Sequence, residues 1–312
     1  MAPGNRNAPF RSTASESQYS LFEFMAEFPD DAACLNWLWR TRHAPDGDHA
    51  MCPKCEVERR FVRYGTAQQR QSWTCTACGH HLHPTAGTIF NKSSTSLHLW
   101  FYAIYLMTST RCGISAKQLE RELGVTYKTA WRMFKLIRTL MAEDTGPLSG
   151  AVEMDETFIN RSRRHRPNEP RLKQGKSGPG ERVIWGAVER GGRVVAKHVP
   201  RASKASIDPM VTQFVMPAST VFTDEAIHYK GLGNRGYQHE RIQHTARIYV
   251  KGDVHTQTIE GFWSLFKRGV TGVYHAVGKD YLQSYLNEYT WRYNHRFDGR
   301  SMFATLVRKA AS

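Results

Sequence analysis

The chain has 312 residues, 40% of them hydrophobic, and its 43 lysines and arginines exceed its 28 aspartates and glutamates for a formal net charge of +15. This length allows two or three domains, each with a core of its own. No run of about 18 apolar residues occurs, so we expect neither a membrane span nor a membrane partner. The positive excess favours a polyanionic partner, foremost nucleic acid, over a merely solvated surface.

The N-terminal fifty residues divide into a leader and a helical segment. Residues 1–20 are polar and lack the apolar stretch of a secretory signal, so we expect a flexible leader and a cytoplasmic protein. Residues 21–50 predict short helices, the second of them started by the sequence PDD at 29–31. Cys34 falls on the apolar face of that helix and is interpreted as a core residue.

Paired cysteines mark residues 51–84 as a zinc ribbon. Two CxxC sequences are separated by nineteen residues that contain strand-like patterns, and they supply Cys52, Cys55, Cys75 and Cys78. Four thiolates from two tight turns complete a tetrahedral structural Zn²⁺ site with no open position. Because the segment has little core, we expect the metal to contribute its folding free energy.

Two alternatives apply to this site. The cysteines could instead form reactive or disulfide pairs, which a reducing cytoplasm disfavours. One of the histidines that follow at once could replace a cysteine ligand, although a position on the surface or facing DNA is the simpler interpretation; these are His80, His81 and His83.

Residues 95–142 predict a helix-turn-helix. An apolar helix comes first, then a helix ending at Leu123, a turn at Gly124, and a helix capped by Thr126. The last helix presents polar residues for a DNA groove, chiefly Lys128, Thr129 and Arg132. An ordinary helical hairpin is the alternative, and the basic residues favour the DNA-binding interpretation.

After a linker at 143–150, residues 150–306 predict a mixed α/β domain, with residues 307–312 as a tail. Strands are expected at 151–159, on both sides of Gly191-Gly192, before Asp224 and at 246–250, with helices between and after them. A basic, Gly- and Pro-containing segment at 161–182 is interpreted as a loop near phosphates, or else as a solvated loop.

Three carboxylates in this domain come from separate elements: Asp155 within a strand, Asp224 at a strand end and Glu260 on a helix. Burying them together is unfavourable unless cations neutralise them, and carboxylate oxygens suit Mg²⁺ or Mn²⁺. Two such ions can clamp the attacking and leaving oxygens of a phosphodiester displacement. On the same helix, Lys267 and the adjacent Arg268 are expected to hold DNA near the acids.

Other assignments stay open for each acid. Glu153 or Glu156 could replace Asp155 as the ligand, and Glu288 could replace Glu260, which could also be a surface acid. Asp224 could be a helix cap instead. His255 is interpreted as structural or DNA-contacting rather than catalytic.

The motifs CPKC and CTACG, GISAKQLERELGVTYKTAWRM, VEMDETF, FTDEA, HTQTIEGFWSLFKRG and NEYTWRYNHR resemble the zinc-ribbon class of bacterial insertion-sequence transposases with a DDE catalytic core. The resemblance covers nearly the whole chain. It implies an RNase H-like catalytic domain with Asp155, Asp224 and Glu260 as its triad. It further implies DNA as the partner, as terminal inverted repeats and target, and cleavage with strand transfer in a bacterial, nucleoid-associated protein. Gln257 departs from the pattern, which often has Asn there.

Paired-end chemistry would require at least a dimer on DNA. Two other functions fit part of the pattern: a DNA-binding regulator derived from an inactive transposase, and an RNase H-type nuclease without strand transfer. The zinc ribbon and helix-turn-helix favour recognition of defined ends, and therefore transposition.

Overall fold

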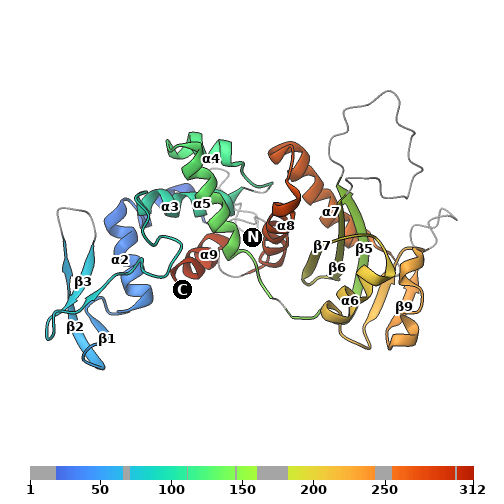
Figure 1. The fold of residues 1–312 in the computed structure, drawn as a ribbon, viewed down its shortest axis with the longest axis horizontal. Coiled ribbons are helices and arrows are strands. Elements are labelled where there is room, and N and C mark those ends of the chain that lie inside the picture. The colour runs from blue at the N-terminus through green and yellow to red at the C-terminus, as the bar shows by residue number, and fades with distance from the viewer. Residues whose placement is uncertain are drawn as a thin grey trace, which may run out of the picture. The chain divides into compact units, whose positions relative to one another are not determined.

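The computed structural model describes residues 19–65, 71–110, 112–144, 146–159, 182–242, 255–298 and 301–312. The chain forms two compact units (Figure 1): one contains Met1–Arg111, Ala116–Leu140 and Phe297–Ser312, and the other contains Cys112–Ser115 and Met141–Arg296. The strand expected at 246–250 and all but the last residue of the basic segment at 161–182 lie outside the described residues. None of the helices in the described ranges is long and apolar enough to cross a bilayer.

The first unit combines helices with a small antiparallel sheet. Its helices are α1 (Leu21–Glu27), α2 (Asp31–Arg42), α3 (Leu97–Ser109), α4 (Ala116–Leu123), α5 (Tyr127–Leu140) and α9 (Met302–Ala311). The sheet has the order β1 (His49–Cys52), β2 (Val57–Tyr64), β3 (Ser72–Cys75) and β4 (His81–Leu82).

The small sheet shares a core with α2. The rings of Trp39 on α2 and Trp73 on β3 stack with centroids 4.7 Å apart, and Phe61 joins the same buried cluster. Cys34 is buried, as expected of a core residue. The helix therefore supplies apolar contacts that a short ribbon lacks.

Helices α4 and α5 form where the sequence predicts them. Gly124, in the turn between them, has a φ of +62°, a conformation that glycine adopts without strain. The Thr126 hydroxyl accepts a hydrogen bond from the backbone N–H of Thr129 at 3.4 Å, as expected of a helix cap. The inward face of α5 is buried, including Ala130 and Met133.

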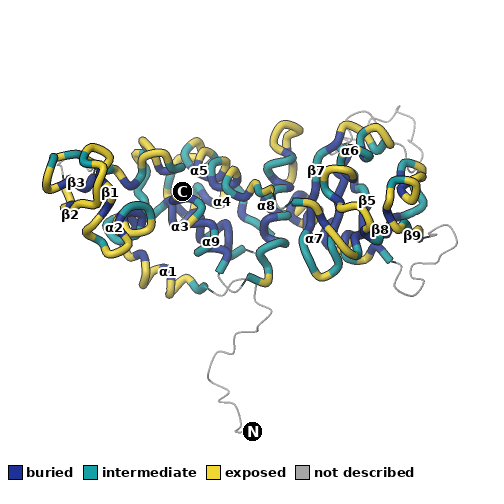
Figure 2. Tube along the Cα trace, turned by 90° about the horizontal axis from the view of Figure 1, so that it is seen from below, coloured by how far each residue is buried: buried dark blue, intermediate teal, exposed yellow. Residues whose placement is uncertain are grey.

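The C-terminal residues differ from the expected division at 306. Apolar residues recur at helical spacing from Met302 to Ala311, and their burial against α3, α2 and α5 makes α9 part of the first unit (Figure 2). These residues are therefore neither the end of the second unit nor a free tail.

The second unit is a mixed α/β fold. Its sheet has the order β7 (Val194–Val199), β6 (Arg182–Glu189), β5 (Ala151–Ile159), β8 (Thr220–Thr223) and β9 (Gln238–Arg241). Strands β5, β6 and β7 are antiparallel, whereas β8 and β9 run parallel to β5. The helices are α6 (Lys204–Phe214), α7 (Gln257–Gly269) and α8 (Leu282–Asn294).

Alternation along β5 separates the two faces of this sheet. Val152 and Met154 join an apolar core with residues of α6. Glu153 and Asp155 point to the opposite face, where both contact α7. One strand thus contributes to the core on one side and to a polar site on the other.

Candidate active site and candidate zinc centre

Asp155 on β5 and Asp224 directly after β8 lie at matching positions of two neighbouring parallel strands. Glu153 of β5 pairs with Phe222 of β8, and each aspartate lies two residues further along. Both are half-buried, and Asp224 Oδ1 accepts a hydrogen bond from the backbone N–H of Ala226 at 2.9 Å. The third predicted acid, Glu260, is exposed in the first turn of α7.

Asp155 lies near enough to three other carboxylates for their charges to act on it. Burial raises the pKa of Asp155 to about 7, with further contributions from the negative charges of Glu156, Asp224 and Glu260. Such a shift indicates a position where a cation would be stabilising. Their oxygens are not drawn together, however, because among the described residues only the four cysteines form a group with all ligand atoms within 4.8 Å.

The Asp155 carboxylate is oriented by α7. Trp263 Nε1 donates a hydrogen bond to Asp155 Oδ2 at 3.1 Å. Gly186, opposite Asp155 on β6, makes this approach possible, because a Cβ there would lie 2.5 Å from the Trp263 ring. No local sequence signal points to this contact, because Trp263 and Asp155 are 108 positions apart.

The alternative ligands on β5 are already engaged. Glu153 is fully buried and accepts hydrogen bonds from Arg190 and from the start of α7. Glu156 accepts hydrogen bonds from His228 Nε2 at 2.8 Å and from the Tyr229 hydroxyl. Their oxygens are therefore less available to a cation than those of Asp155.

Glu288 on α8 is also fully buried and paired. Arg292 Nη2 donates to its Oε1 at 2.9 Å, and the Tyr274 hydroxyl lies 3.2 Å from each carboxylate oxygen. This pairing favours a structural role over substitution for Glu260. His255 has a structural position too, with Nδ1 3.2 Å from Glu153 Oε1.

His228 is a neighbour of the acids that the sequence did not single out. Burial lowers the pKa of its imidazole, but the hydrogen bond and charge of Glu156, with Asp224 and Asp155, raise it overall. A protonated His228 would partly neutralise this acidic cluster. The segment DEAIHY contains His228, but the sequence does not indicate its contact with Glu156, because the two residues are 72 positions apart.

Metal-free Asp155→Asn should be more stable than the wild type at pH 8. Because folding raises the pKa of Asp155, the penalty for ionising it is absent below about pH 4, grows as the pH rises towards 7, and is constant above that. We expect a gain on the order of a few kcal/mol in the free energy of unfolding at pH 8 that vanishes near pH 4. Denaturant titrations with chelator at both pH values measure it.

Asp208→Asn is the matched control, because Asp208 pairs with Arg235 at 2.9 Å and should not gain stability when neutralised. Equal stability of Asp155→Asn and wild type at pH 8 would contradict the prediction.

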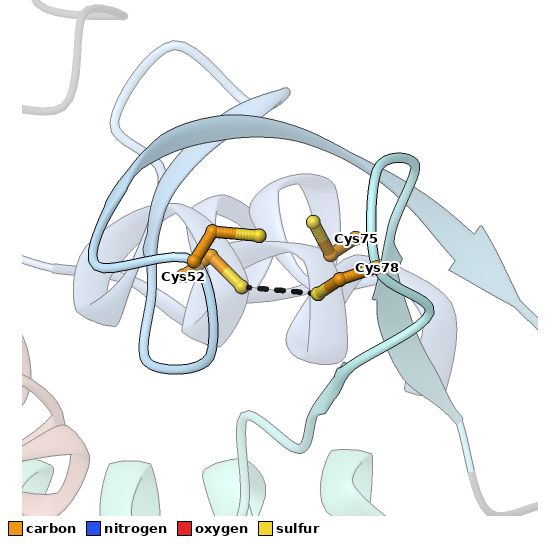
Figure 3. Close-up of side chains that lie close together, drawn as sticks. Cys52, Cys75 and Cys78 are labelled. Carbon is orange, nitrogen blue, oxygen red and sulfur yellow. Dashed lines mark hydrogen bonds between the residues drawn. The ribbon is translucent and has the colours of Figure 1, made fainter.

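The four cysteines come together as predicted (Figure 3). Cys52 and Cys75 are buried, Cys55 and Cys78 are half-buried, and all four sulfur atoms lie within 4.8 Å of one another. Burial raises the pKa of the Cys52 thiol, but hydrogen bonds from backbone amides and neighbouring thiols lower it to about 7 overall. Four converging sulfur atoms fit a tetrahedral Zn²⁺ site.

The predicted DNA-binding side chains are accessible. Lys128 and Arg132 on α5 are exposed and Thr129 is half-buried. Lys267 and Arg268 are exposed in the last turn of α7, on the helix that also bears Glu260. These positions allow contacts with a nucleic acid.

Comparisons of sequence find transposon proteins. Residues 147–294 match a family model described as the ISXO2-like transposase domain. An uncharacterised protein in transposable element ISH50 of Halobacterium salinarum is 28% identical over 272 residues, which cover 83% of this chain and 90% of that protein. An uncharacterised transposase-like protein of Haemophilus influenzae is 29% identical over 96 residues, 31% of this chain and 76% of that protein. These matches confirm the resemblance to insertion-sequence transposases.

Solved structures give weaker matches. A chain of the simian T-cell lymphotropic virus intasome in complex with PP2A regulatory subunit B56 gamma has a TM-score of 0.28 and 12% identity, over 52% of this chain and only 56% of that one. A chain of the Mos1 strand transfer complex has a TM-score of 0.27 and 12% identity, over 68% and 78%. These scores are too low to support an argument, so the resemblance to transposases rests on sequence.

Proposed function

We propose, from the match of residues 147–294 to the ISXO2-like transposase domain, that this chain is the DNA transposase of an insertion sequence and cleaves and joins DNA at the ends of its element. The observation that carries the proposal is the position of Asp155 and Asp224, each two residues beyond the paired Glu153 and Phe222 on neighbouring parallel strands. There, burial and the charges of Glu156, Asp224 and Glu260 raise the pKa of Asp155 to about 7. Such an arrangement of acids is unfavourable in a protein that only binds DNA, and it suits a site that binds cations.

The acids act together in this proposal. Asp155, oriented by Trp263, would hold the cations together with Asp224 and Glu260. Mg²⁺ or Mn²⁺ ions bound there would activate a water molecule or a DNA 3′-hydroxyl and stabilise the departing 3′-oxygen. Glu260 is exposed and carried on one helix, so it can approach the aspartates when cations draw the carboxylates together.

The strand arrangement supports an RNase H-like catalytic domain. Three antiparallel strands are followed by two that run parallel to the central β5, and the acids lie on β5, directly after β8 and on α7. Asp155 is thus on the central strand and Asp224 directly after its neighbour β8, and Glu260 is on the helix that packs against β5.

DNA recognition is assigned to elements other than the acids. The zinc ribbon and the α4–α5 pair would bind the terminal inverted repeats, with Lys128, Thr129 and Arg132 directed at the DNA. Lys267 and Arg268 would hold the DNA backbone near the acids. The net charge of +15 supports a nucleic-acid partner. Joining two ends in one reaction calls for at least a homodimer on DNA, acting on the bacterial nucleoid.

An assay on DNA that carries the element's own inverted repeats tests the proposal. With Mg²⁺ or Mn²⁺, the wild-type protein should nick at the repeat ends and join them to target DNA, and chelator should abolish both products. Cleavage without joining would favour a nuclease. Specific binding without cleavage would favour a regulator and would overturn the transposase assignment.

A further inference from the structure

Glu153 is a fully buried carboxylate that the proposed chemistry does not use. Its two oxygens accept four hydrogen bonds: from Arg190 Nε at 2.8 Å, from the backbone N–H and hydroxyl of Thr258 at 2.8 and 2.9 Å, and from the backbone N–H of Ile259 at 3.1 Å. Three of the four donors are in the first turn of α7. A buried charge so fully paired must either stabilise the fold or fix the geometry of what it contacts.

The start of α7 depends on this carboxylate. The first N–H groups of a helix have no partner within the helix and usually receive the side chain of the N-cap residue. Here the N-cap residue Thr256 makes no such bond, and its hydroxyl instead donates to Glu260 Oε1 at 3.2 Å. Glu153, from a strand about a hundred positions earlier, takes over the capping role and places its negative charge at the positive end of the helix dipole.

Arg190 connects Glu153 and α7 to β8, the strand that leads to Asp224. Its Nη2 donates to the His255 backbone oxygen at 2.9 Å, just before α7, and its guanidinium lies 4.0 Å from the ring centroid of Phe222. Phe222 is on β8, two residues before Asp224, and pairs with Glu153. Glu153 and Arg190 therefore touch the strand of Asp155, the strand that leads to Asp224, and the helix of Glu260.

We propose that Glu153 is a positioning residue that, with Arg190, fixes the first turn of α7 to β5 and β8 and so sets the separation of the three acids. The proposal rests on the proposed function for its catalytic consequence, but the attachment of α7 can be measured without activity. Glu153 and Asp155 lie two positions apart on one face of β5. Glu153 therefore holds the helix that carries Glu260, while Asp155 faces the proposed substrate site.

Glu153→Gln tests the proposal, because it keeps the size of the side chain but presents an NH₂ group where the carboxylate accepts helix amides. In the full-length protein, hydrogen exchange of the α7 first turn should become about tenfold faster or more, with β6 and β7 unchanged. Cleavage of inverted-repeat DNA should fall about 10- to 100-fold with binding to the ends unchanged. Glu189→Gln is the control, since Glu189 pairs with Arg193 in the same sheet and should change neither readout.

Thr258→Val keeps Glu153 and the backbone bonds and removes a single donor, which provides a mild variant in case Glu153→Gln does not fold. It should accelerate exchange in the same turn to a smaller extent. Unchanged exchange in α7 of both variants would overturn the proposal, as would wild-type cleavage by Glu153→Gln with faster exchange. If the wild type itself does not cleave, the proposed function fails, and the exchange experiment alone decides whether Glu153 holds the helix.

Discussion

Asp155→Asn, Asp224→Asn and Glu260→Gln should each abolish metal-dependent cleavage while leaving binding to the element's ends intact. Each change keeps the size of the side chain and removes one anionic ligand, so a cation clamp for phosphoryl transfer is lost. We expect a fall of at least about 10³-fold, equivalent to about 4 kcal/mol in the activation barrier. DNA binding should persist because the basic residues assigned to it lie on α5 and in the last turn of α7.

The measurement compares cleavage and strand transfer with end binding for each variant at several Mg²⁺ and Mn²⁺ concentrations. Asp208→Asn on α6 and Glu240→Gln on β9 are matched controls that remove a carboxylate outside the cluster, and both should react like the wild type. Wild-type cleavage by any of the three acid variants would mean that its ligand is misassigned. Glu156 would then be the next candidate on β5, since its charge also contributes to the raised pKa of Asp155.

The alternating pattern of VEMDETF was enough to predict a strand, and the structure confirms it as β5. The pattern also places Glu153 and Asp155 on one face. It cannot assign different tasks to them, because the partners of Glu153 on α7 are 105 and 106 positions away. Local signals such as spacing and turn residues do not indicate which carboxylate a distant helix will cover.

Elements with clear periodicity and caps were predictable, as α5 and the β6–β7 hairpin show. Two features were not. Of the tail expected at 307–312, all but Ser312 belongs to α9. The sequence indicates an amphipathic helix there, but only its packing partners on α3 show which unit it joins. Strand β9 was missed because Gln238–Arg241 is polar, and a strand at a sheet edge needs little apolar sequence.

The acids illustrate a further limit. Their residue types and order predict a cation site, but the pKa of Asp155 depends on burial and on three other carboxylates brought close by the fold. The contact from Trp263 depends in turn on the absence of a side chain at Gly186. A sequence can thus suggest the ligands, whereas their orientation arises from residues that look like ordinary core positions.

Removing zinc should unfold the ribbon and weaken binding to the element's ends. Cys52 and Cys75 are buried in the same cluster as Trp73 and Phe61, so their sulfur atoms lie within the core that the metal would hold together. Structural zinc contributes on the order of 10 kcal/mol to folding of small domains, more than the stacking of Trp39 on Trp73 can replace. We therefore expect Cys52→Ser or Cys78→Ser to lose bound zinc, and hydrogen exchange in β1–β3 to approach that of an unfolded chain.

The experiment combines zinc content by elemental analysis, hydrogen exchange and end binding. Cys112→Ser is the matched control, because Cys112 lies outside the four-sulfur cluster and should retain one zinc per chain. Affinity for the inverted repeats should fall in the ribbon variants, while exchange in the β5–β9 sheet stays as in the wild type because that sheet has its own apolar core. A Cys52→Ser protein with full zinc, or a zinc-free protein with a protected ribbon and wild-type end binding, would show that the cysteines are not a structural zinc site.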